Sequence, residues 1–129
     1  MTEATVSAEY LAEFSAAFNA HDVDKLMSMM TADCIFEGAA GPEVYGIRFE
    51  GRDAVAEAFS AVWASFPDAH WGNGKHRVDG DFGLSEWTFT GTRNDGARIE
   101  ADGVDLFTFS NGKIATKKAF RKDRPLQNS

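Results

Sequence analysis

Apolar residues in the first half of the chain recur at helical spacing. Three stretches have apolar positions three or four residues apart, as in amphipathic helices. The first carries Tyr10, Leu11, Phe14 and Phe18, the second Val23, Leu26, Met27 and Met30, and the third Val55, Ala58, Phe59, Val62, Trp63 and Phe66. Ser7 is placed to cap the first helix, and Pro67 to end the third. The first two helices are expected to form a helical hairpin.

The second half of the chain changes to the alternating pattern of strands. Extended segments are expected at 70–78, 84–93, 98–110 and 113–121, separated by sequences typical of tight turns. A shorter strand is expected at 34–38, followed by a loop that contains Gly41 and Pro42. Helices followed by strands in hairpins predict an α+β domain, in which helices pack on one face of an antiparallel sheet.

Composition and charge restrict the kinds of ligand that the protein is expected to bind. A chain of 129 residues with 43% hydrophobic content is expected to form one domain over residues 1–129, with short tails at 1–5 and 125–129. A formal net charge of −7 repels nucleic acid and anionic membranes, so the expected ligand is a small molecule. The single cysteine, Cys34, excludes an intramolecular disulfide, and no apolar run typical of a secretory signal or a membrane span is present. A cytoplasmic location is expected.

One acidic residue stands out within the predicted strand at 98–110. Asp105 lies in the segment GVDLFTFSNGKI (103–114), where apolar residues occupy both faces of an extended strand. A carboxylate buried there would be desolvated, and its pKa would rise from roughly 3.9 toward neutrality. Asp105 is therefore the first candidate for a catalytic acid or base.

Three segments carry a resemblance to a known superfamily. They are NAHDVDKLMSMMTADCIFEG (19–38), FEGRDAVAEAFSAVW (49–63) and GVDLFTFSNGKI (103–114), and they resemble the nuclear transport factor 2-like superfamily, in its SnoaL-like polyketide cyclase and steroid isomerase branch. The resemblance implies a cone-shaped fold, in which a curved mixed or antiparallel sheet wraps around three helices and leaves a pocket. It also implies a homodimer, with Trp87 and Phe89 facing outward to be covered. Since this fold hosts enzymes and non-catalytic proteins, function depends on the site residues.

Carried over residue by residue, the resemblance preserves only part of the steroid isomerase site. Asp105 matches the aspartate of the oxyanion hole. The tyrosine of that hole corresponds to Phe14, and the catalytic base corresponds to Gly38, with Glu37 one residue away. The acid of the polyketide cyclases falls near Ala119. The resemblance therefore implies a site without the usual partners of Asp105.

The family register supplies a different set of polar residues. If Asp105 points into the cone, the residues expected to point inward are Glu86, Thr88 and Thr90 on one neighbouring strand and Lys117, Ala119 and Arg121 on the other. Buried charges are costly unless they are paired, so salt bridges between the two carboxylates and the two cations are expected. In one interpretation Asp105 or Glu86 is a general acid or base, and Lys117 or Arg121 binds an anionic oxygen. In the other the network is structural, or the cations face solvent.

Histidine and aromatic residues leave further alternatives open. His76 either reaches the pocket mouth as an acid or base or lies on the surface. Phe14, Phe18 and Phe107 either line a pocket for a flat or cyclic apolar ligand or fill the core. No pair of histidines has the spacing of metal ligands, so neither a metal nor a cofactor is expected.

These observations predict a small cytosolic protein that binds a cyclic or polyketide-like ligand. The favoured function is cofactor-free acid/base catalysis by an isomerase, cyclase or lyase. The alternative is a non-catalytic ligand-binding or dimerisation module with structural buried charges. The expected catalytic residues are Asp105 and Glu86, and the expected ligand-binding residues are Arg121, Lys117, His76, Phe14, Phe18, Thr88 and Phe107.

Overall fold

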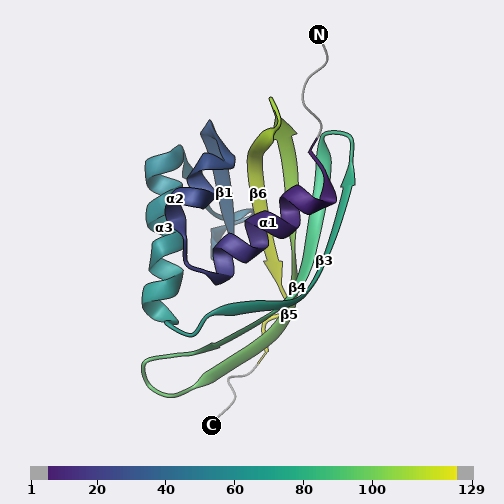
Figure 1. Cartoon of the computed structure of the whole chain (residues 1–129). Helices are drawn as coiled ribbons and strands as arrows, with labels where there is room; N and C mark the ends of the chain where they lie inside the picture. The colour runs from purple at the N-terminus through teal and green to yellow at the C-terminus, as the bar shows by residue number, and fades with distance from the viewer. Residues whose placement is uncertain (1–5, 125–129) are drawn as a thin grey trace.

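Three helices and one six-stranded sheet make up the part of the chain that this computed structural model describes, residues 6–124. The predicted tails at 1–5 and 125–129 lie outside the described residues. The elements follow in the order α1 (Ala8–Asn19), α2 (Val23–Ser28), β1 (Met30–Glu43), β2 (Gly46–Glu50), α3 (Arg52–Ser65), β3 (His70–Asp79), β4 (Phe82–Thr92), β5 (Arg98–Ser110) and β6 (Lys113–Arg121). Figure 1 shows a curved sheet, with α1 crossing in front of it and α3 standing beside β1. The predicted α+β cone is confirmed.

Local signals set the helix boundaries. The Tyr10 N–H donates a hydrogen bond of 3.2 Å to Ser7 Oγ, so Ser7 caps α1 as predicted. Gly51 precedes α3 with φ of 88°, a left-handed conformation that favours glycine. The second helix is shorter than predicted, because it ends at Ser28 and Met30 begins β1 as a fully buried residue.

The strand order in the sheet is β2-β1-β6-β5-β4-β3. Neighbouring strands are antiparallel except β1 and β6, which pair in parallel, so the sheet is mixed. The four strands predicted in the second half are confirmed within a few residues at their ends. One strand was missed, because the predicted loop at Gly41 and Pro42 is the end of β1, which turns into β2 at the sheet edge. Proline is tolerated at a sheet edge, where its missing N–H leaves no partner unpaired.

Contacts between elements hold the helices on the concave face of the sheet. The Asn19 side chain donates to the Trp71 carbonyl at 3.0 Å and accepts from the Trp71 N–H at 2.8 Å, which fixes α1 against β3. The Asp68 carboxylate, just after α3, accepts hydrogen bonds of 2.7 Å from the N–H and the hydroxyl of Thr92. The far end of the β4–β5 hairpin therefore bends under the C-terminal end of α3 (Figure 1).

The core lies between the helices and this concave face. Its fully buried side chains include Leu26, Cys34, Val55 and Phe59, so the prediction that Cys34 is a core residue is confirmed. Within residues 6–124, no helix has both the length and the apolar character needed to cross a membrane.

Candidate functional site

The inward-facing residues of β4 have the opposite parity to the one predicted. Ser85 lies directly across from Asp105 in the β4–β5 pair, and residues directly opposite each other share a face of the sheet. Ser85, Trp87 and Phe89 are accordingly buried, whereas Glu86 is exposed. The expected inward orientation of Glu86 was wrong, because a shift of one residue in register moves every side chain to the other face.

The same shift removes the predicted threonines from the pocket. Thr88 donates a hydrogen bond of 2.7 Å to the exposed Asp102 carboxylate on the outer face, and Thr90 has the same parity on β4. Trp87 and Phe89 face inward, so the prediction that they lie outward was wrong. They therefore give no support to the expected homodimer.

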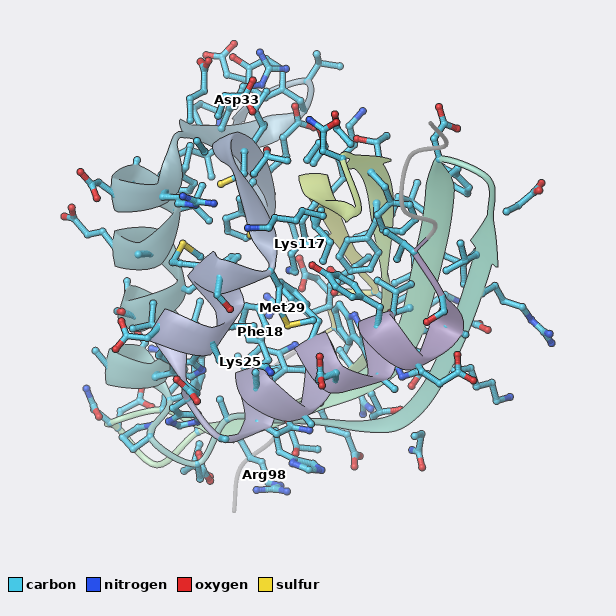
Figure 2. The ribbon with its side chains drawn as sticks, turned by 45° about the horizontal axis from the view of Figure 1, so that its top comes forward. Phe18, Lys25, Met29, Asp33, Arg98 and Lys117 are labelled. Atoms are coloured by element: carbon cyan, nitrogen blue, oxygen red, sulfur yellow. The ribbon has the colours of Figure 1, made fainter. Side chains whose placement is uncertain are left out.

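The inward orientation predicted for β6 is confirmed. Lys117, Ala119 and Arg121 all line the same cavity as Asp105. Lys117 is only 6% exposed, and Figure 2 shows it between the helices and the sheet, whereas Asp33 and Arg98 lie at the periphery.

Asp105 and Lys117 form a buried ion pair. Lys117 Nζ lies 3.2 Å from Asp105 Oδ1, and both residues are less than 8% exposed. The Trp87 indole N–H donates a hydrogen bond of 3.0 Å to Asp105 Oδ2. Of the predicted salt bridges this one is confirmed, while Arg121 pairs instead with the exposed Asp123 at 2.8 Å.

Two effects act on the protonation of Asp105. Burial raises the pKa of the carboxyl above its ordinary value of 3.8, because the charged form is desolvated. The charge of Lys117 and the hydrogen bond from Trp87 act in the other direction and lower the pKa. Burial is the larger effect, so the pKa of Asp105 is raised overall, as predicted from the sequence.

Three aromatic rings surround the ammonium group of Lys117. Its Nζ lies 4.6 Å from the ring centre of Phe36, 5.0 Å from that of Phe18 and 5.5 Å from that of Phe59. Each distance is within the range of a cation–π contact. The lysine is therefore fixed in place by both an ion pair and its aromatic contacts.

A cavity of about 550 Å³ opens beside this ion pair, between α3 and the sheet. Its walls are largely apolar and include Phe18, Phe36 and Phe49, with Ala58 and Val62 from α3. Such a volume and lining are typical of a site for a small, mostly apolar molecule with a few polar groups. Arg121 and Glu57 add two further charges to its wall.

The position that holds the base in steroid isomerases carries no acid here. Gly38 lines the large cavity, and the neighbouring Glu37 forms an ion pair of 2.8 Å with Arg48, its directly opposite partner on β2. Phe36 points into the cavity, so the next residue along the strand, Glu37, points to the outer face. Asp105 is consequently the buried carboxyl group of this pocket.

The remaining predicted ligand contacts lie away from the large cavity. Phe14 and Phe107 are buried and line a smaller cavity of about 20 Å³, which also reaches Asp105. His76 lines neither cavity, so it does not reach the mouth of the pocket. Its Nδ1 lies 2.7 Å from the buried Ser85 hydroxyl, and burial lowers the pKa of its imidazole. Phe18 lines the large cavity as predicted.

Several site residues were not found from the sequence. Trp87, the hydrogen-bond donor to Asp105, was assigned to the outer face, and Ser85 was not considered. The alternation of β4 carries the missing signal, since its apolar residues Trp87 and Phe89 share one parity with Ser85. Among residues 6–124, no group of three or more histidine, cysteine, aspartate or glutamate side chains is arranged to hold a metal ion.

A glycine on β5 makes room for the Trp87 ring. A Cβ at Gly103 would overlap this ring and the Phe120 carbonyl. We expect Gly103→Ala to lower the free energy of unfolding by about 1–3 kcal/mol, because an added methyl group forces a packed ring to move. Urea denaturation followed by tryptophan fluorescence measures this loss. Gly72→Ala is the control, because its Cβ would meet nothing closer than 3.4 Å. Equal stabilities of the two variants would contradict the prediction.

Comparison with known proteins identifies a matching protein family. The model of the SnoaL-like domain family matches residues 11–117. No curated protein sequence matches the chain.

Solved structures share the fold over most of their length. An NTF2-like protein of unknown function from Mesorhizobium loti is 27% identical with a TM-score of 0.73, and the match covers 90% of each chain. A candidate polyketide cyclase from Xanthomonas campestris pv. campestris is 18% identical with a TM-score of 0.77, over 87% of each chain. A phenazine biosynthesis-related protein from Pseudomonas aeruginosa is 21% identical with a TM-score of 0.73, over 88% of this chain and 77% of that one.

Proposed function

Because the chain belongs to the SnoaL-like family of the nuclear transport factor 2-like superfamily, we propose that it binds a small cyclic, polyketide-like carbonyl compound and moves a proton on it. The observation that carries this proposal is the Asp105–Lys117 pair at the wall of the 550 Å³ aromatic cavity. A carboxyl group with a raised pKa next to a fixed ammonium group is suited to proton transfer near neutral pH.

The chemistry follows from the position of the two charges. Ionised Asp105 accepts a proton from the carbon next to the ligand carbonyl, and the electron pair of the broken C–H bond moves to the carbonyl oxygen. The Lys117 ammonium group stabilises the enolate oxygen that develops. Protonation by Asp105 of another carbon conjugated with the enolate completes an isomerisation. In a cyclisation, the enolate carbon attacks a second carbonyl within the ligand, and Asp105 returns its proton to the alkoxide oxygen that forms. These steps use side chains alone.

The apolar walls select the body of the ligand. Phe18, Phe36 and Phe49 offer ring faces to a flat or cyclic compound, and α3 lines the cavity with the small residue Ala58. Arg121 places a positive charge on the same wall, which favours a ligand with a further oxygen substituent.

A non-catalytic binding module is the second candidate. It is favoured by the contacts of Lys117, because an ammonium group that meets both Asp105 and three rings has the geometry of a structural ion pair. In that case the pocket binds its ligand and no proton moves. The cytoplasmic location and the homodimer stay predictions under either function.

Hydrogen exchange into a ketone distinguishes the two candidates. We expect the protein to accelerate the exchange of deuterium from D₂O into 2-tetralone, at the benzylic carbon next to its carbonyl, because Asp105 would abstract that proton. Proton NMR follows the loss of the signal against buffer alone. Ala58→Trp should abolish the acceleration by filling the cavity, whereas Ala64→Trp should not, since Ala64 is exposed and lies outside the cavity lining. Binding of 2-tetralone without any acceleration would favour the non-catalytic module.

A further inference from the structure

A second cavity reaches Asp105 from the side of α1. Its volume is about 20 Å³, and its polar lining residues include Ser85, Asp105 and Lys117. A cavity needs roughly 10–15 Å³ to hold one water molecule, which also needs two to four polar partners. This cavity is thus large enough for one water molecule and too small for an organic ligand.

A row of polar residues leads across the concave face to this cavity. His76 on β3 lies directly opposite Ser85 on β4, and Ser85 lies directly opposite Asp105 on β5. Directly opposite residues in antiparallel strands have their Cβ atoms about 4.5–5.5 Å apart on one face of the sheet. The first pair is in hydrogen-bond contact, with 2.7 Å between His76 Nδ1 and Ser85 Oγ.

One oxygen of Asp105, Oδ1, has room for a further hydrogen-bond donor at the end of this row. Oδ2 accepts the bond from Trp87, while Oδ1 is fully buried and has, among the described residues, only Lys117 as a polar partner, at 3.2 Å. Lys117 lowers the pKa of this carboxyl both through its charge and as a hydrogen-bond donor. A carboxylate oxygen has two lone pairs, so one contact with an ammonium group leaves a second position for a donor.

We propose that the small cavity is a water site, in which one water molecule bridges the Ser85 hydroxyl and Asp105 Oδ1, and that His76 and Ser85 are positioning residues for Asp105. The water accepts a hydrogen bond from the Ser85 hydroxyl and donates one to Oδ1. His76 Nδ1–H donates to Ser85 Oγ, which turns the hydroxyl proton toward the water. The row of side chains then supplies a further hydrogen bond to the buried carboxylate, besides those from Trp87 and Lys117.

The neutral state of His76 fits this arrangement. Burial lowers the pKa of its imidazole, so at neutral pH one ring nitrogen carries a proton and the other does not. The charged groups around Asp105 are Lys117, which contacts it, and Arg121 and Glu57, which line the larger cavity. The bridging water carries no charge, and its hydrogen bond lowers the pKa of Asp105 in addition to the lowering by Lys117.

The first measurement is a high-resolution crystal structure of the unaltered protein. We expect an ordered water molecule within hydrogen-bond distance of both Ser85 Oγ and Asp105 Oδ1, and the same position without water in Ser85→Ala. A dry cavity in the unaltered protein, or a direct hydrogen bond between Ser85 and Asp105, would overturn the proposal. The structure of the unaltered protein alone can overturn the proposal, so this outcome does not depend on the folding of a variant.

The second measurement is the pKa of Asp105, from the ¹³C shift of its carboxyl group as a function of pH. We expect Ser85→Ala to raise this pKa by about one unit, because a hydrogen bond to the charged form is lost. His76→Leu should raise it by a smaller amount, since the hydroxyl then loses its orientation but not its presence. Thr108→Ala, which removes an exposed hydroxyl from β5, is the control and should leave the pKa unchanged.

Failure of this inference can be distinguished from failure of the proposed function. Only the catalytic use of Asp105 rests on the proposed function; the water site does not. An unchanged or lowered pKa of Asp105 in Ser85→Ala overturns the water bridge, even where deuterium exchange into 2-tetralone is found. A bridging water with a raised pKa in Ser85→Ala supports it, even where no ketone is turned over.

Discussion

Lys117→Met is expected to lower the free energy of unfolding by about 3–5 kcal/mol at pH 8, because it leaves the buried Asp105 carboxylate without its cation. Methionine nearly matches the lysine in size, so the loss reports the missing charge more than a cavity. Urea denaturation monitored by circular dichroism measures it. Lys118→Met is the matched control, since Lys118 is exposed and its replacement should change stability by less than about 0.5 kcal/mol.

The loss of unfolding free energy in Lys117→Met should be smaller at acidic pH. The pKa of Asp105 is raised in the folded protein, and removal of Lys117 raises it further because the lysine charge lowers it. A carboxyl group with a raised folded pKa contributes stability that is fully present below its unfolded pKa and is lost as pH rises through the folded pKa. The difference between the variant and the unaltered protein should therefore be largest at pH 8 and smaller at pH 5.

A double variant tests whether the effect belongs to the pair. Asp105→Asn combined with Lys117→Met removes both charges and retains an acceptor for the Trp87 N–H. We expect the double variant to recover most of the stability lost in Lys117→Met at pH 8 and to lose its pH dependence, because no buried charge is left unpaired. A double variant as unstable as Lys117→Met would show that the lysine stabilises the fold through its packing alone.

Asp105→Asn is expected to slow deuterium exchange into 2-tetralone at least about a hundredfold, the range that general acid–base catalysis contributes. The amide keeps the size of the carboxyl group and cannot accept the proton. Ligand affinity should change little, since the aromatic walls of the cavity are untouched. Proton NMR gives the exchange rate, and the dissociation constant comes from titration with the ketone.

The control for this variant lies on the same strand. Asp102→Asn changes an exposed carboxylate on the outer face and should leave the exchange rate unaffected. In the unaltered protein the rate should rise with pH as Asp105 ionises, through a pKa that burial places above 3.8. An unchanged rate in Asp105→Asn would remove this residue from the mechanism and leave it a role in stability.

The sequence allowed the elements to be predicted better than their register. Ser7 marks the start of α1 by its capping side chain and Pro67 the end of α3 by its backbone, so a local pattern was sufficient for these two boundaries. The parity of β4 depends on which residue pairs with Asp105, and a shift by one exchanged Glu86 for Ser85. Trp87 and Phe89 are apolar residues of one parity on β4. This alternation by itself predicts that they face the core together with Ser85, as observed.

The ion pair was predicted more successfully than the other charged contacts. Asp105 lies among apolar neighbours, and the register of β6 predicts that Lys117 faces it, so the cost of burial predicts that the two charges pair. Arg121 lies at the end of β6, where the exposed Asp123 is within reach and competes for it. Such a competition depends on the path of the chain after the strand, which no local pattern describes.

The parallel pairing of β1 with β6 constrains the order in which the pocket can assemble. The hairpins from β3 to β6 form between segments close in sequence, whereas paired residues of β1 and β6, such as Ile35 and Thr116, are separated by most of the chain. Closing so long a loop is entropically costly and slows folding. Phe36 and Lys117 are partners in this pairing, so the ammonium group meets its aromatic surroundings only when the late closure is made. We therefore expect the pocket to assemble late in folding. Variants that remove the contacts of Lys117 should then accelerate unfolding more than they slow refolding.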